Sequence, residues 1–368
     1  MTLLTLSNLA DIDSLGVKNS IYTLAKSTEC PPHLPLLSGT EAYAESWIVN
    51  WHSDPQKCRL TDVCCYSIAD ALVSGDGQIW IADHLITSPE VMPIYVARGL
   101  ELEKGGSARL HRDRKLLVRT ISEPCLVAIG HGTMVYGHFL IEMLFRLMVA
   151  QEALAKSGIS YRVLLDRESP PWLLYILHHY FGVQLNQMEF FRPSVERVHL
   201  RHAIIPGRVL QDSGFHPYAN ILLRRLLASL PAAKLEYTSR RFFILRNKLV
   251  NPAAPSRICV NEPQLAAIAA RAHGFVPITI ENMEWRDQIA IFQDAEIILG
   301  QAGSGLHNAL FSSSSSRLAS IGFMNQIQSQ ISTLRLQRMA YLTQNVELKG
   351  KFSVDETVFG EFLERVCG

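Results

Sequence analysis

The order of apolar segments over the last two thirds of the chain is the feature that most restricts the fold. From residue 126 onward, short apolar runs alternate with segments whose apolar residues recur at helical spacing. Such alternation favours a parallel sheet with helices on both faces. The first series predicts strands and helices in turn at residues 126–129, 137–157, 161–166, 171–181, 198–205 and 218–230. The sequence therefore predicts an α/β fold.

A second series of the same kind follows a short linker at residues 231–239. It predicts strands and helices in turn at residues 241–246, 262–273, 276–280, 285–294, 296–299, 305–311 and 317–321. We interpret the two series as two Rossmann-like domains facing a cleft, within 1–234 and 235–345. The segment 346–368 predicts an amphipathic helix, which we expect to pack back on the first domain.

The part of the first domain before its α/β series has a different pattern. Residues 60–120 contain short apolar runs separated by turns, which predicts a small β-rich lead-in to the α/β part at 121–234. The Ser-Gly-Asp-Gly sequence at 74–77 predicts a hairpin turn. A length of 368 residues also suits two domains.

Composition and charge exclude several classes of protein. Hydrophobic residues make up 48% and charged residues 19%, which suits large cores and excludes a disordered chain. The formal net charge is +1, without the basic excess typical of nucleic-acid binding. No segment reads as a signal peptide or a membrane span. We therefore expect a cytoplasmic protein with at most a peripheral membrane contact; its oligomeric state stays open.

The cysteines do not form a framework. Seven are present and no Cys-x-x-Cys pair occurs, so we expect free thiols and no zinc site.

The strongest local motif is a glycine loop between a buried strand and a helix. Gly300, Gly303 and Gly305 would let a ligand approach the backbone, and the free N–H groups of the helix start favour an anion, typically a diphosphate. The spacing differs from the dinucleotide fingerprint, and no ribose-binding acid follows about 20 residues later, which disfavours NAD. The alternative is a tight turn without a ligand.

A second motif places His138, Glu142 and Arg146 four residues apart, on one face of a predicted helix. A His–Glu pair can serve as a base and its orienting carboxylate, and an arginine can bind an anion. His131 lies in a glycine-flanked loop before the same helix. The alternative is an ordinary polar helix face.

A third group follows the first strand of the second series. Arg246 ends that strand, and Arg257, Asn261 and Glu262 precede or open the next helix. Ligands bind at such strand ends in open α/β sheets, where an arginine can hold a phosphate with two hydrogen bonds. Surface ion pairing is the alternative.

Taken in order, these motifs resemble glycosyltransferase family 61. The resemblance covers about residues 120–325 and also includes Gln288, Asn308 and Phe311. It implies a GT-B fold and inverting transfer from a nucleotide sugar, usually UDP-linked, without an essential metal or other cofactor. It implies His138 and Glu142 as catalytic residues, and His131 and Arg146 as contacts to the acceptor or a phosphate. The implied donor-binding residues are Arg246, Arg257, Asn261, Glu262, Gln288, Gly303, Ser304, Gly305, Leu306, His307 and Asn308.

The chain departs from the family pattern at two places. It has Ala302-Gly303-Ser304 where the family commonly has His-Gly-Ala, and Phe145 where a proline commonly precedes the arginine. The first departure removes an imidazole beside the expected phosphate loop, for which His307 could substitute. The identity of the donor therefore stays open.

We thus expect a metal-independent inverting glycosyltransferase, a hexosyl- or pentosyltransferase of polysaccharide biosynthesis, which transfers a sugar to a hydroxyl acceptor such as a glycan. The single Asp-x-Asp pair, Asp11 and Asp13, precedes any clear strand and is interpreted as a loop or helix-start feature. We favour His138 as the base with Glu142 orienting it, and keep the reversed roles as the alternative. A non-catalytic nucleotide-sugar-binding subunit and a GT-B-type sugar-nucleotide epimerase are the other functions considered.

Overall fold

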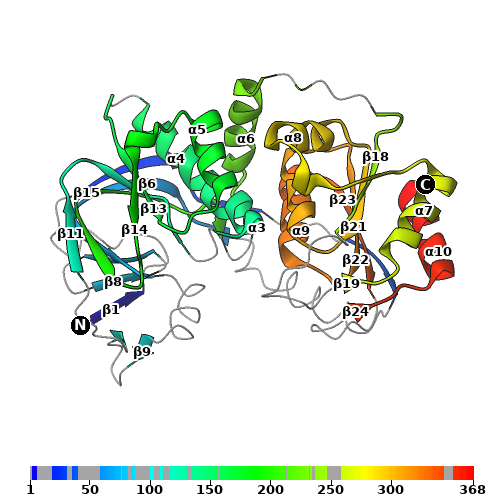
Figure 1. The fold of residues 1–368 in the computed structure, drawn as a ribbon, viewed down its shortest axis with the longest axis horizontal. Coiled ribbons are helices and arrows are strands. Elements are labelled where there is room, and N and C mark those ends of the chain that lie inside the picture. The colour runs from blue at the N-terminus through cyan, green and yellow to red at the C-terminus, as the bar shows by residue number, and fades with distance from the viewer. Residues whose placement is uncertain are drawn as a thin grey trace. The chain divides into compact units, whose positions relative to one another are not determined.

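The protein divides into two compact units of mixed α/β structure (Figure 1). The first comprises Met1–Thr28 and Thr61–Asp212, and the second comprises Glu29–Leu60 and Ser213–Gly368. The computed structural model describes residues 2–5, 19–30, 35–39, 59–75, 77–81, 84–87, 100–102, 108–110, 117–130, 134–155, 158–211, 214–231, 233, 237–246, 258–343 and 351–368. The expected pair Asp11 and Asp13 lies outside these residues.

The first unit is built on a mixed sheet that has ten strands within the described residues. Its main path runs through β1 (Thr2–Thr5), β8 (His84–Thr87), β7 (Gln78–Ile81), β6 (Val63–Ser74), β15 (Glu196–Pro206), β12 (Cys125–Val127), β13 (Arg162–Asp166) and β14 (Met188–Phe191). β11 (Leu117–Ile121) pairs with β15, and β2 (Asn19–Ala25) pairs with β6. β12 to β15 are parallel, whereas β6, β7 and β8 are antiparallel neighbours. The expected β-rich lead-in is thus continuous with the α/β sheet.

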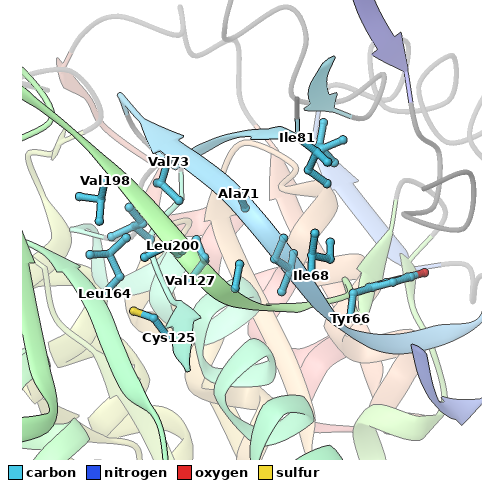
Figure 2. Close-up of a cluster of buried hydrophobic side chains, with 14 of the residues drawn as sticks. Tyr66, Ile68, Ala71, Val73, Ile81, Cys125, Val127, Leu164, Val198 and Leu200 are labelled. Carbon is cyan, nitrogen blue, oxygen red and sulfur yellow. The ribbon is translucent and has the colours of Figure 1, made fainter. Parts of the chain in front are cut away.

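The strands, together with Ile129 just after β12, supply one core cluster of this unit. Apolar side chains from β6, β7 and β8 and from β11 to β15 pack together, and Figure 2 shows those of Tyr66, Ile68, Val127, Leu164 and Leu200 among them. The hairpin predicted at 74–77 joins β6 to β7, with Ser74 opposite Gln78. Gly75 and Gly77 have φ values of 50° and 85°, a conformation that favours glycine.

Two helical segments connect the parallel strands of the first unit. A continuous helix between β12 and β13 consists of α3 (Tyr136–His138), the π-helical turn η3 (Phe139–Met143) and α4 (Leu144–Leu154). α5 (Pro171–Phe181) begins with a proline in its first turn and ends at Gly182, whose φ is 67°. The remaining elements before residue 213 are β3 (Thr28–Glu29), β5 (Arg59–Leu60), β9 (Leu100–Leu102), β10 (Ala108–Leu110), η4 (Leu185–Gln187) and β16 (Leu210–Gln211).

The second unit contains a parallel sheet with six strands within the described residues. Its spatial order is β20 (Val276–Ile278), β18 (Arg241–Ile244), β21 (Ile297–Gln301), β22 (Arg317–Gly322), β23 (Arg338–Thr343) and β4 (Leu36–Gly39). The chain therefore moves from β18 to one neighbour, β20, and then crosses to the other side of β18 to form β21. The strand order reverses at this point. Crevices at such a reversal, beyond the carboxyl ends of the strands, are where open α/β sheets bind ligands.

Helices cover both faces of the second sheet (Figure 1). α7 (Glu262–His273) and α10 (Glu356–Cys367) share a buried apolar cluster with β18, β21, β22 and β23. On the opposite face, η6 (Ser304–Phe311) contacts both α8 (Trp285–Asp294) and α9 (Gln326–Arg335). The other elements are α6 (Tyr218–Ser229), η5 (Ile280–Asn282), β17 (Gly214–Phe215), β19 (Ile258–Cys259) and β24 (Lys351–Phe352).

Two segments belong to the second unit, namely α6, which we expected within the first domain, and α10, which we expected to pack back on that domain. The C-terminal helix α10 buries Phe359 and Phe362 against α7 and the second sheet. Helix α6 is joined to α9, because Asn220 Nδ2 donates to Leu334 O at 2.9 Å and Arg335 Nη1 donates to Asn220 Oδ1 at 2.6 Å. The units divide at Asp212/Ser213, before α6, rather than at the linker that follows it.

Candidate functional site

The glycine loop lies at the carboxyl end of β21, where the strand order of the second sheet reverses. Ala302 is fully buried, whereas Gly303, Ser304 and Gly305 are partly exposed and begin η6. The first hydrogen bond of η6 runs from Leu306 N to Gly303 O, at 3.1 Å. Among the described residues no acceptor is found for the N–H groups of residues 303, 304 and 305. Three consecutive N–H groups of this kind form a site suited to an anion.

Gly303 is required by space rather than by its backbone angle, because its φ of 165° is open to any residue. A Cβ atom at this position would lie 2.5 Å from Arg246 Nη1. At Gly305 a Cβ atom would lie 3.3 Å from Ile280 Cδ1 and 3.4 Å from Ile244 Cγ2. The loop thus needs its glycines for close packing against the end of β18 and the segment after β20.

Arg246 connects β18 to this loop. It follows β18 by two residues and is half-buried. Its Nη1 atom donates a hydrogen bond to Ala302 O at 2.8 Å, and its backbone N–H donates to Glu262 Oε2, also at 2.8 Å. Glu281, an exposed residue after β20, interacts electrostatically with the Arg246 guanidinium. A cation is therefore held against the glycine loop.

Glu262 and Asn261 support this arrangement from within the unit. The Glu262 side chain is fully buried, and it fixes the backbone of Arg246. The Asn261 amide donates to Val354 O at 2.7 Å and accepts from Val354 N at 3.0 Å. The sequence places both residues in the donor site, whereas the contacts show them positioning backbone. A direct contact with a donor stays a prediction for both.

The other donor-site candidates of the second unit are also mostly buried. Leu306, His307 and Asn308 are at most 7% exposed, and Asn308 Nδ2 donates to Gly305 O at 3.1 Å, which stabilises the loop. Gln288, 8% exposed on α8, donates from Nε2 to Met283 O at 3.0 Å. His307 is thus largely buried within the unit, and its substitution for the imidazole that the family pattern commonly has beside Gly303 stays a prediction.

In the first unit, His138 and Glu142 are in direct contact. His138 Nδ1 and Glu142 Oε1 are 3.0 Å apart, with side chains 40% and 16% exposed. Both belong to the segment that includes the π-helical turn η3, an irregularity frequent at functional sites. The predicted pairing is confirmed; the catalytic roles stay predictions.

Glu142 lies among positive charges. Burial on its own would raise the pKa of this carboxyl, but the hydrogen bond from His138 and the charges of Arg146 and Arg208 lower it below its ordinary value. Arg208 Nη2 is 4.0 Å from Glu142 Oε2. Arg146 Nη1 donates to Ile129 O at 3.3 Å. Glu142 is consequently ionised at neutral pH, and a proton on Nδ1 of His138 would be held toward it.

Sequence reasoning missed Arg208, Glu281 and Gln328. Arg208 follows the long strand β15, and Glu281 follows β20 at the carboxyl edge of the second sheet. Both could have been suspected because they come directly after predicted strands. Gln328 lies on α9, a helix that we did not predict, and donates from Nε2 to Gly303 O of the glycine loop at 3.4 Å. Two expected site residues, His131 and Arg257, lie outside the described residues.

Neither a metal-binding cluster nor a membrane-spanning helix occurs among the described residues. No three His, Cys, Asp or Glu side chains there are grouped as a metal site requires. None of the six cysteines described forms a disulfide. None of the described helices is both long and apolar enough to span a membrane. Metal independence and a cytoplasmic location stay predictions.

Comparison with known families agrees with the motifs. A family model described as Glycosyltransferase 61 matches residues 136–319, which is half of the chain. The match begins just before His138 and ends in β22, so it includes both the His138–Glu142 pair and the glycine loop. The chain belongs to glycosyltransferase family 61 and is a glycosyltransferase. No curated protein sequence matches it.

Proposed function

We propose that this glycosyltransferase transfers a sugar from a nucleotide donor, UDP-linked in the first instance, to a hydroxyl acceptor such as a glycan, with inversion and without a metal. The observation that carries the proposal is the pairing of Arg246 with the glycine loop at the strand-order reversal. The N–H groups of Gly303, Ser304 and Gly305 would bind the donor diphosphate, and Arg246 would neutralise part of its charge.

The second unit supports the role of donor domain. Its strand order around β18 is that of a doubly wound nucleotide-binding sheet, with the candidate site at the reversal. The first unit carries the His138–Glu142 pair and would supply the acceptor side. In a GT-B enzyme, two Rossmann-like domains likewise bind the donor and the acceptor. We propose this architecture for the protein.

The proposed reaction uses His138 as the general base. Since the Glu142 carboxylate faces Nδ1, the tautomer with its proton on Nδ1 leaves Nε2 able to accept the proton of the acceptor hydroxyl. The acceptor oxygen attacks the anomeric carbon opposite the diphosphate, the bond from that carbon to the diphosphate breaks, and the nucleoside diphosphate leaves. Loop N–H groups and Arg246 stabilise the charge that develops on the leaving oxygen.

The lowered pKa of Glu142 favours this assignment over the reversed one. A carboxylate held ionised by an imidazole and two guanidinium groups is a weaker base than an ordinary one, because its proton affinity is reduced. Glu142 is therefore better suited to orient His138 and to stabilise the imidazolium that forms.

The test is to incubate the protein with a panel of UDP- and GDP-sugars, with and without glycan acceptors. We expect acceptor-dependent release of nucleoside diphosphate and a product of inverted anomeric configuration, as read by NMR. Conversion of the donor without an acceptor would instead indicate an epimerase. Binding without turnover on any acceptor would indicate a nucleotide-sugar-binding subunit. A product of retained configuration would contradict the direct displacement.

A further inference from the structure

We propose that Gln328, on α9, is a positioning residue for the donor site, which sets the direction of the peptide group that joins Gly303 to Ser304. This inference rests on the proposed function, because it assigns a task within the diphosphate site. Gln328 lies beyond the stretch that the family model matches. Its side chain is fully buried, so it would act through the loop rather than by touching the donor.

Three elements hold the glycine loop from its inner side. Ala302 N donates to Ile321 O of β22 at 3.0 Å. Ala302 O accepts from Arg246 Nη1, after β18, at 2.8 Å. Gly303 O accepts from Gln328 Nε2, on α9, at 3.4 Å. Two consecutive carbonyl groups are thus bound by side chains from two different elements, the end of β18 and α9.

A planar trans peptide points its carbonyl and its N–H in opposite directions. Holding Ala302 O inward therefore turns the N–H of Gly303 away from Arg246, and holding Gly303 O on α9 turns the N–H of Ser304 away from Gln328. These N–H groups belong to the three that have no acceptor among the described residues. The two side chains together fix the donors that the diphosphate would meet.

Glycine makes this restraint necessary. Since Gly303 has no Cβ, rotation about its backbone bonds is less restricted than in any other residue, and the peptide that follows can reorient at low cost. The hydrogen bond from Leu306 N also holds Gly303 O, but it belongs to the first turn of a 3₁₀ helix, which frays readily. Gln328 adds a restraint from a neighbouring helix.

The environment of Gln328 is hard to explain by stability alone. Its Oε1 atom is buried and has no hydrogen-bond partner among the described residues. Burying an amide with one acceptor unsatisfied is unfavourable, and an apolar side chain of similar size would avoid that cost. The long contact from Nε2 to Gly303 O therefore contributes little to the folding energy. We infer that its role is to orient the Gly303 carbonyl group.

Gln337, two residues after the end of α9, offers a matched control. Its side chain is 3% exposed, and its Oε1 atom likewise has no partner among the described residues. Its Nε2 atom donates to Ala309 O at 3.1 Å and to Ser313 O at 3.2 Å. Gln328→Met and Gln337→Met therefore remove the same buried amide from the two ends of η6.

The experiment measures the affinity of the full chain for UDP and for uridine, by calorimetry or ligand-observed NMR. Loss of one orienting hydrogen bond should weaken UDP binding about fivefold to tenfold in Gln328→Met. Uridine should bind as to the wild type, because it lacks the diphosphate. Gln337→Met should leave both affinities unchanged. With a saturating acceptor, the donor KM should rise in Gln328→Met more than kcat falls.

Several results would overturn the inference. They are unchanged UDP affinity in folded Gln328→Met, an equal loss for uridine, or an equal loss in Gln337→Met. Should Gln328→Met fail to fold, Gln328→Asn decides in the same way, since it keeps an amide but is one methylene too short to reach Gly303. If the wild type binds neither UDP nor GDP, the proposed donor site is contradicted. If the wild type binds UDP and Gln328→Met binds it equally well, only the role of Gln328 is contradicted.

Discussion

Arg246 donates from Nη1 to the carbonyl oxygen of Ala302, 2.8 Å away, and so joins the carboxyl ends of β18 and β21 where the strand order reverses. The contact has two consequences. It places a cation at the glycine loop, and it fills the space that a side chain at position 303 would need. The glycine loop, Arg246 and the carboxyl ends of β18 and β21 are therefore connected. Single substitutions can test the contribution of each part.

Gly303→Ala should weaken UDP binding by at least about tenfold with little loss of folding stability. The new Cβ would meet Arg246 Nη1, the far end of a flexible side chain that can move aside. Its displacement moves the guanidinium away from the bound diphosphate, and the charge-assisted contact to that diphosphate is worth about 1.5–3 kcal/mol. Calorimetric titration with UDP, together with thermal melting, measures both effects.

The control is Gly360→Ala in α10, where a Cβ would meet no atom within 4 Å. That change should stabilise the helix by about 0.5–1 kcal/mol and leave UDP affinity unchanged. Wild-type UDP affinity in Gly303→Ala would show that the loop does not bind the donor.

Arg246→Lys should reduce transfer about 10- to 150-fold while the chain still folds. Lysine keeps the charge but lacks the planar guanidinium, so it cannot hold Ala302 O and the diphosphate in the same geometry. The predicted reduction in rate follows from the free energy of a charge-assisted hydrogen bond, which is about 1.5–3 kcal/mol. Steady-state kinetics at saturating acceptor measure the change. A wild-type rate would make Arg246 a structural residue of the loop.

Most elements of the second unit were predictable because their apolar periodicity is local. Helices α7 and α8 occupy the predicted residues, and the glycine loop follows its predicted strand. The His138–Glu142 contact likewise follows from spacing on one helix. Local spacing fixes which residues share a helix face, and this is why these parts of the candidate site could be predicted.

The missed parts depend on partners far away in the chain or on weak patterns. β4 joins the sheet by pairing with β23, about 300 residues later, which no local pattern reports. Helix α9 carries apolar residues at 327, 331 and 334, a helical spacing, but Gln and Ser surround them and the segment resembles a loop. Because α9 was missed, so was Gln328.

The wild type should lose more stability in acid than Glu142→Gln does. A carboxyl whose pKa is lowered on folding contributes stability that is present above its ordinary pKa of 4.5 and is lost as the pH falls through the folded value. Melting temperatures between about pH 6 and pH 3 should therefore converge for the two proteins on acidification, as linkage requires. A constant difference across this range would show that Glu142 has the same pKa in the folded and unfolded chains.

Transfer should persist in excess EDTA. In the proposed chemistry the loop N–H groups and Arg246 stabilise the leaving diphosphate, a task that a divalent cation performs in metal-dependent enzymes. The measurement is the initial rate with chelator, then with Mn²⁺ or Mg²⁺ restored. Complete loss that Mn²⁺ reverses would contradict the metal-independent proposal.

The last prediction concerns the His138–Glu142 pair, where chemistry and structure forecast different results. If His138 is the base, His138→Ala should lower turnover by about 10²–10⁴, the usual worth of a positioned proton transfer. UDP affinity should stay near normal, because the proposed donor site lies in the other unit.

Glu142→Gln should then reduce turnover less than His138→Ala. It keeps an oxygen that can accept from Nδ1 at the 3.0 Å contact, and it removes only the charge that holds the imidazole and stabilises its protonated form. The reverse order, with Glu142→Gln the more damaging change, would make Glu142 the base. Turnover within a few-fold of wild type in both variants, with earlier melting in both, would assign the pair to folding and leave the base to be sought at His131.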